Sequence, residues 1–130
     1  MILALKTDNP TAEIVLLDVE GRVIEQEEWL AERRLALELL GRLESLLSRH
    51  DATWSTLTGL VVFRGPGSFT GLRIGITVMN TIAYSQTIPI VGTITEQWRQ
   101  LGVERLQKAE NDTIALPEYG APARITTPRK

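Results

Sequence analysis

Apolar and β-branched residues gather in short runs near the start of the chain. Residues 2–5 form one such run, and two more, residues 13–17 and 22–26, lie on either side of the acidic segment 18–21. A β-rich run on each side of a short loop that ends in glycine is typical of a hairpin. The pattern therefore predicts three consecutive antiparallel strands.

The period of the apolar positions changes to that of a helix from about residue 30 to residue 48. The recurring positions are Leu35, Leu39, Leu43 and Leu46 or Leu47. Ala36, Leu37 and Leu40 widen the apolar stripe beyond what a single packing surface needs. Gly41 costs this helix about 1 kcal/mol relative to alanine, which close approach of another helix would offset. We expect either a second packing partner for this helix or a cover formed by the C-terminal tail.

Later segments predict further crossover elements. Residues 59–63 fit a buried strand, and a helix that starts near Ser68 carries apolar Leu72, Ile76, Met79 and Ala83. A third helix fits the region that starts at Thr93 or Thr95 and ends before residues 110–112. Strands that alternate with helices indicate parallel pairing in this half of the sheet.

Residues 65–75, between the fourth strand and its helix, contain four glycines and one proline. A strand, a glycine-rich turn and a helix form the layout of an anion site, because the N–H groups of the first helical turn attract negative charge. Ser68 or Thr70 can cap the helix. The candidate anion-binding residues are Gly65, Pro66, Gly67, Ser68, Phe69, Thr70, Gly71 and Arg73.

The glycine spacing matches neither common nucleotide fingerprint. In a dinucleotide loop the third glycine would come one residue before Gly71, and a P-loop would place a lysine after a glycine. The alternative is that the glycines serve the backbone. Gly65 and Gly67 would then supply a positive φ for a tight turn, while Gly71 and Gly75 would allow close helix packing.

The eleven residues GPGSFTGLRIG at positions 65–75 resemble the signature of the TsaB (YeaZ) family. The resemblance extends to residues 2–7, which are similar to the family's first strand, and to residues 89–93, which are similar to the strand after the signature helix. It implies a single actin-like, Hsp70-like lobe of the RNase H-like class, with a mixed five-stranded sheet and about three helices. We expect this lobe over residues 1–110 and an extended tail over residues 111–130.

The resemblance also implies a function. TsaB proteins are non-catalytic partners of the TsaD enzyme, which makes threonylcarbamoyladenosine on tRNA, and two of their helices pair with TsaD or with a second copy in a helical bundle. We therefore expect an accessory subunit without metal or cofactor, in a heterodimer with TsaD or a homodimer when alone, with a TsaE-type ATPase as another candidate partner. The residues expected to bind the partner are Leu35, Leu39, Leu43, Leu72, Gly75, Ile76 and Met79.

Few residues offer catalytic chemistry. The chain has no cysteine and one histidine, His50, which is predicted at the end of the first helix, so Ser68 and Thr70 have no nearby base. Lys6 stands where, by the resemblance, catalytic relatives carry a metal-binding acid, and an ammonium repels a metal ion. The alternative function is an actin-like nucleotide-binding or phosphotransfer enzyme that uses residues 65–75. Lys6 and the lack of a second lobe favour the accessory subunit.

Charge and hydropathy limit the partners. A formal net charge of −2 argues against a free-standing nucleic-acid binder, so tRNA would be contacted only indirectly. Arg124, Arg129 and Lys130 give the tail a basic end. No segment approaches the roughly twenty apolar residues of a membrane span, and no leader precedes the first strand. We expect a cytoplasmic protein that does not bind membranes.

Overall fold

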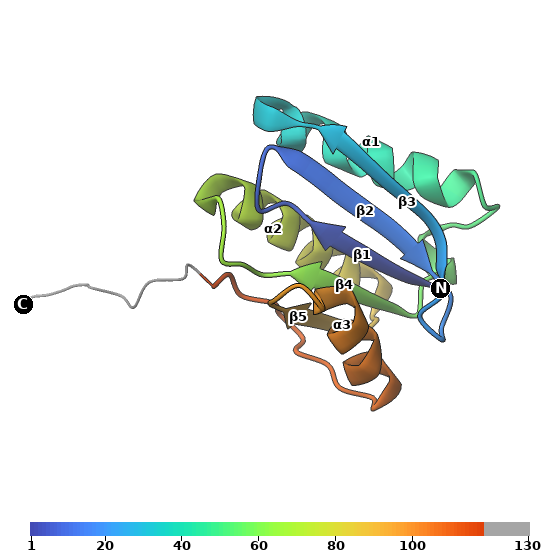
Figure 1. The fold of residues 1–130 in the computed structure, drawn as a ribbon. Helices are drawn as coiled ribbons and strands as arrows, with labels where there is room; N and C mark the ends of the chain where they lie inside the picture. Colours follow the sequence, from blue (N-terminus) through green and yellow to red (C-terminus); the bar gives the residue numbers. More distant parts are fainter. Residues whose placement is uncertain (119–130) are drawn as a thin grey trace, which may run out of the picture.

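The computed structural model describes residues 1–118, which form a five-stranded sheet with three α-helices (Figure 1). The strand order is β3-β2-β1-β4-β5. β2 pairs antiparallel with both β1 and β3, whereas β4 pairs parallel with β1 and β5. The predicted mixed α/β sheet is therefore confirmed. The strands are β1 (Ile2–Lys6), β2 (Thr11–Leu17), β3 (Val23–Leu30), β4 (Gly59–Phe63) and β5 (Ile90–Thr93).

The β2–β3 hairpin turns at the acidic segment that the sequence indicated. One carboxylate oxygen of Asp18 accepts hydrogen bonds from the backbone N–H groups of Glu20 and Arg22, each at 2.9 Å. Gly21 has a φ of 94°, which glycine adopts without steric cost. The aspartate thus supplies the acceptors inside the turn, and the glycine lets the chain reverse.

The three helices lie on both faces of the sheet (Figure 1). They are α1 (Leu35–Ser48), α2 (Phe69–Gln86) and α3 (Trp98–Gln107). α2 packs on the face that carries Leu5, which is paired in register with Val62, whereas α3 packs against Val61 on the opposite face. α1 lies beside α2 and covers β2. The β1–β3 part of the second face carries no helix (Figure 1).

Two helices begin later than the sequence suggested. Leu30 is the last residue of β3, and Glu32 has a φ of 47° in a short 3-10 turn that precedes α1. Thr93 ends β5, and Thr95 has a φ of 81°, so α3 starts only at Trp98. In both places a left-handed residue separates the strand from the helix, and apolar spacing carries no signal for such a residue.

Most of the core lies between the sheet and the α1–α2 pair. Leu39, Leu43 and Met79 are each 0% exposed. Full burial of a leucine or methionine side chain stabilises a fold by about 1.5–3 kcal/mol. On the α3 side, the rings of Phe63 and Trp98 meet edge to face with centroids 6.0 Å apart. The sheet is thus held by a large apolar layer on one face and a smaller aromatic one on the other.

Residues 111–118 follow α3 as an extended segment that contacts β5, α2 and the loop after β4. These residues form no helix or strand. Expectations for Arg124, Arg129 and Lys130 concern positions outside the described residues. The division of the chain at residue 110 stays a prediction.

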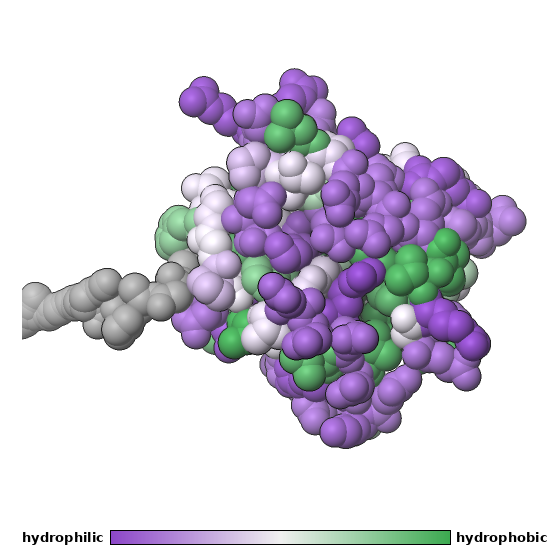
Figure 2. All heavy atoms as spheres, viewed as in Figure 1, coloured by the Kyte–Doolittle hydropathy of each residue, from purple (hydrophilic) through white to green (hydrophobic). Residues whose placement is uncertain are grey.

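The molecular face that carries α3 and the helix-free part of the sheet is mainly hydrophilic, with separate hydrophobic patches (Figure 2). A hollow of about 610 Å³ lies between α3 and the β2–β3 hairpin and is lined by Glu20, Glu96 and Glu104 among others. Within residues 1–118, no helix combines the length and the hydrophobicity that crossing a membrane requires.

Candidate partner interface and the glycine loop

The glycine loop joins β4 to α2 and lies against the end of β1. Gly65 has a φ of 118°, and a Cβ at this position would overlap the carbonyl oxygen of Glu118. A Cβ on Gly67 would overlap the side chain of Asp8. Other parts of the chain therefore pack against both sides of the loop, which leaves no room for a larger residue at either glycine.

The two glycines inside α2 allow the helix to approach β1. A Cβ on Gly71 would overlap the carbonyl oxygen of Thr7, and one on Gly75 would overlap the Thr7 hydroxyl. That hydroxyl donates a hydrogen bond of 2.8 Å to the Gly71 carbonyl, and the Ser68 N–H donates one of 2.7 Å to the Asp8 carbonyl. The backbone interpretation of Gly65, Gly71 and Gly75 is thus confirmed, whereas Gly67 needs no positive φ.

The first turn of α2 carries the remaining signature residues. Ser68 is the N-cap, although its side chain makes no capping hydrogen bond, and the guanidinium of Arg73 lies 5.1 Å from the centre of the Phe69 ring. Ser68 and Thr70 face a cleft of about 450 Å³ that also contacts Ala31 and Arg33 before α1. An anion-binding role for this turn stays a prediction.

Lys6 and Asp8 occupy the end of β1 beside the loop. The Lys6 Nζ lies 2.6 Å from an Asp8 carboxylate oxygen and 4.6 Å from the centre of the Phe63 ring. The carboxylate thus has a cationic partner already, and the neighbouring turn is held by Asn9, whose side-chain oxygen accepts from the Thr11 N–H at 2.9 Å. Among residues 1–118, no group of three or more acidic, histidine or cysteine side chains is arranged to hold a metal ion.

The residues that the sequence analysis assigned to partner binding lie in the core of the lobe. Six of them are at most 5% exposed, and Gly75 is buried against Thr7. They pack against the sheet, so in this fold they position the two helices and do not form their outer surface. The assignment is therefore corrected for all seven residues, which are Leu35, Leu39, Leu43, Leu72, Gly75, Ile76 and Met79.

The outer surface of α1 carries apolar residues as well. Leu37 is 77% exposed and Leu40 is 49% exposed. Gly41 lies beside them, and a Cβ at this position would have no heavy atom within 4 Å in the described chain. The sequence analysis noted Leu37 and Leu40 as an excess over one packing stripe and Gly41 as a position for close helix approach, and that excess is the signal of this second face.

Helix geometry shows which flanks of α1 and α2 meet. Positions two residues apart on a helix point about 200° from each other. Arg42 contacts Glu27 of β3, so Leu40 lies on the opposite flank of α1, toward α2. Asn80 contacts Ala115, so Val78 lies on the flank of α2 toward α1, where it is half-buried against the core. We call these residues the outer seam of α1 and α2: Leu37, Leu40 and Gly41, which are exposed on α1, and Ile74 and Val78, which are half-buried on α2.

An ion-pair network ties the other flank of α1 to the edge strand β3. Arg49 lies 2.9 Å from Glu25 and 2.8 Å from Glu27, and Arg42 lies 2.8 Å from Glu27. The His50 Nε2 lies 2.7 Å from Glu25, just after the helix end where the sequence analysis expected this residue. Glu25 and Glu27 therefore anchor α1 to the edge strand β3.

These contacts shift the acid–base properties of the two glutamates. Hydrogen bonds from Arg49 and then from His50 lower the pKa of Glu25. Partial burial would raise the pKa of Glu27, but hydrogen bonds from Arg42 and Arg49 outweigh it and lower that pKa as well. Both carboxylates are therefore held in the charged form in the folded protein.

The chain matches one protein family and several curated relatives. The family model described as "TsaD: tRNA N6-adenosine threonylcarbamoyltransferase" matches residues 28–98. The tRNA threonylcarbamoyladenosine biosynthesis protein TsaB of Bacillus subtilis is 38% identical over 89 residues, which cover 68% of this chain and 38% of that protein. TsaB of Escherichia coli is 30% identical over 114 residues, which cover 83% of this chain and 48% of that protein. The chain spans less than half the length of these relatives.

Solved structures show the same relationship in three dimensions. YeaZ from Pseudomonas aeruginosa superposes with a TM-score of 0.66 at 31% identity, over 72% of this chain and 43% of that one. RuvC of Thermus thermophilus superposes with a TM-score of 0.50 at 13% identity, over 74% of this chain and 64% of that one, a likeness of fold alone. Both fit the expected actin-like lobe of the RNase H-like class. The chain belongs to the family that the TsaD model describes, and within it to the TsaB (YeaZ) members.

Proposed function

We propose that this chain is an accessory subunit of tRNA threonylcarbamoyladenosine biosynthesis that binds and supports a TsaD-type threonylcarbamoyltransferase. The observation that carries the proposal is the outer seam of α1 and α2, where two leucines are exposed beside half-buried apolar residues on a lobe of TsaB type. The names of the curated relatives supply the pathway, and the family model that matches residues 28–98 points to the enzyme.

The outer seam suits a helical partner. Leu37 and Leu40 project from adjacent turns of α1, and burial of two leucines contributes roughly 3–6 kcal/mol at most, before the costs of association. Gly41 leaves the helix backbone accessible beside them, so a second helix can approach closely there. Two helices of the partner laid along the seam would complete a four-helix arrangement with α1 and α2.

An accessory role without catalysis fits the residues around the glycine loop. The loop is packed against Asp8 and Glu118, and the cationic Lys6 stands beside it. In the described chain, His50 bonds to Glu25 at the β3 edge and does not reach the hydroxyls of Ser68 and Thr70. No observation favours the nucleotide-binding alternative over this role.

The proposal is tested by placing charge on the seam. We expect Leu37→Glu and Leu40→Glu to fold normally and to lose binding to a purified TsaD-type transferase in sedimentation velocity. A carboxylate in an apolar helical interface would have to be desolvated without a partner. Leu101→Glu is the matched control, because Leu101 is a 40% exposed helical leucine on the opposite face of the sheet. Wild-type binding by both seam variants would contradict the proposed interface.

The same experiment without the enzyme addresses self-association. We propose that the seam also joins two copies when the chain is alone, because an apolar strip of this kind is then left in water. A wild-type chain that is dimeric and a Leu37→Glu variant that is monomeric would support this; a dimeric variant would place the contact elsewhere.

A TsaE-type ATPase can be added to the mixture with the transferase to test whether it joins the complex.

A further inference from the structure

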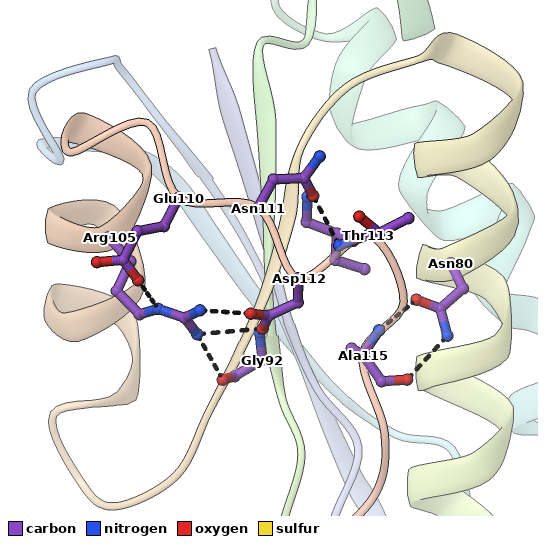
Figure 3. Close-up of polar contacts among 9 residues, drawn as sticks. Asn80, Gly92, Arg105, Glu110, Asn111, Asp112, Thr113 and Ala115 are labelled. Atoms are coloured by element: carbon purple, nitrogen blue, oxygen red, sulfur yellow. Dashed lines mark hydrogen bonds and ion pairs between the residues drawn. The ribbon is translucent and has the colours of Figure 1, made fainter.

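Residues 111–118, here called the brace, cross the molecule from α3 to α2 along the outer edge of β5 (Figure 3). The brace is an extended segment without regular secondary structure, yet it makes polar contacts with three parts of the fold. Those parts are the edge of β5, the middle of α2 and the loop that leads into α2.

The first attachment closes the edge of β5. The Asn111 side chain accepts a hydrogen bond of 3.1 Å from the Ile90 N–H, and the Asp112 N–H donates one of 2.8 Å to the Ile90 carbonyl. The Asp112 carboxylate accepts another, also of 2.8 Å, from the Gly92 N–H. These contacts occupy backbone groups that would otherwise be free at the sheet edge.

Arg105 of α3 locks this attachment. Its guanidinium contacts Asp112 of the brace and Glu110, which directly precedes the brace. It also donates a hydrogen bond of 3.1 Å to the Gly92 carbonyl (Figure 3). Partial burial would raise the pKa of Asp112, but the hydrogen bonds from Arg105 and the Gly92 N–H outweigh it and lower that pKa. Asp112 is therefore a charged anchor between α3 and β5.

The second attachment is to α2. The Asn80 side chain donates a hydrogen bond of 3.0 Å to the Ala115 carbonyl and accepts one of 2.8 Å from the Ala115 N–H (Figure 3). A single amide thus satisfies both backbone groups of one brace residue. Ala115 is 2% exposed, and a Cβ on Gly92 would lie 3.3 Å from its methyl group. The residue is wedged between α2 and β5.

The third attachment is to the glycine loop. The Glu118 N–H donates a hydrogen bond of 2.6 Å to the Arg64 carbonyl, and the Arg64 side chain donates one of 3.2 Å to the Leu116 carbonyl. The Arg64 N–H in turn donates to the Thr93 carbonyl at 2.9 Å. The brace therefore holds the loop at the point where the chain leaves β4.

We infer that the brace positions α2, through Asn80 and the glycine loop, so that the outer seam presents the geometry that the partner binds. This inference rests on the proposed function, because the seam is the surface whose geometry matters. Asn80 lies on the flank of α2 away from the seam, so it acts as a positioning residue without touching the partner. With the brace attached to the middle of α2 and to the β4 end of the loop before it, α2 cannot shift along the sheet without straining one of these contacts.

The test combines a binding measurement with hydrogen exchange on folded protein. Asn80→Ala removes both bonds to Ala115; we expect about tenfold weaker binding to the TsaD-type transferase and faster amide exchange in α2. Tyr84→Ala is the matched control, since Tyr84 lies one turn further on the same flank and is 89% exposed. Its affinity and exchange should equal those of the wild type.

A second variant covers the case in which Asn80→Ala does not fold. Asp112→Ala detaches the brace from β5, and Glu110→Ala removes a different bond to the same arginine as its control. We expect weaker binding for Asp112→Ala alone. If the brace variants exchange faster but bind with wild-type affinity, the inference is overturned and the proposed function stands. If the wild-type chain itself does not bind the transferase, the proposed function fails, and the inference with it.

Discussion

Leu39 and Leu37 lie two residues apart on α1, yet the first is 0% exposed and the second is 77% exposed. The same contrast recurs on α2, where Met79 is buried and Thr77 faces solvent. The inner faces hold the helices on the sheet, and the outer faces are available to other molecules. Stability and binding are therefore carried by different residues of the same helices, so substitutions on the two faces should have separable effects.

The largest expected effect comes from charging the inner face. Leu39→Glu or Met79→Glu would bury a carboxylate without a partner, which costs several kcal/mol, a large part of the stability of a domain. We expect both variants to lose the cooperative unfolding transition in urea, followed by circular dichroism. Leu37→Glu, on the exposed face, should change the free energy of unfolding by less than about 0.5 kcal/mol. A folded Leu39→Glu variant of normal stability would contradict the assignment of stability to the inner face.

A smaller effect is expected at Gly75, where the absence of a side chain lets α2 lie close to the sheet. A methyl group at position 75 would overlap the Thr7 hydroxyl and crowd Leu5, so Gly75→Ala should destabilise the protein by about 1–3 kcal/mol despite the better helix propensity of alanine. Chemical denaturation gives the measurement. An increase in stability would show that α2 can move away from β1 without cost.

Gly41 should behave in the opposite way. Nothing in the described chain lies within 4 Å of an added methyl group there, so Gly41→Ala should stabilise the isolated protein by about 0.5–1 kcal/mol through helix propensity. In the presence of the transferase the same variant should bind less tightly, because the methyl group would occupy the space left for the partner helix. Calorimetry of the variant alone and in the complex separates the two effects.

The smallest expected effect concerns the flank between the two faces, where Glu25 and Glu27 contact Arg49. Their pKa values are lowered in the folded state, so the stability they add is present above the unfolded pKa of about 4.3. This added stability is lost as the pH falls through the lowered pKa values of the folded state, where protonation of the glutamates breaks the ion pairs. Arg49→Gln should therefore flatten the pH dependence of stability below about pH 4.5 and leave it unchanged near neutrality. An unaltered acid profile would show that the network contributes nothing.

Much of the fold follows from local patterns. The hairpin at Asp18 and Gly21, the buried strands and the extent of α2 were predictable because turn chemistry and apolar period act over a few residues. The starts of α1 and α3 were not, because a positive φ at Glu32 and Thr95 depends on surrounding structure and not on residue type.

The interface was only half predictable. The leucine excess on α1 correctly indicated two apolar stripes, but Leu39 and Leu37 are chemically identical, and only the position of the sheet decides which of them is buried. Asn80 and Asp112 gave no signal, because isolated polar residues acquire their roles from a brace that is distant in the sequence.

The glycine loop has a consequence for the order of folding. Its final packing needs Asp8 from the turn after β1 and Glu118 from the far end of the described chain, so it is complete only when both segments are in place. On the ribosome, the sheet and α2 can assemble before residue 118 emerges, while the loop completes its packing only afterwards. The signature segment is thus among the last parts of the lobe to reach its native structure.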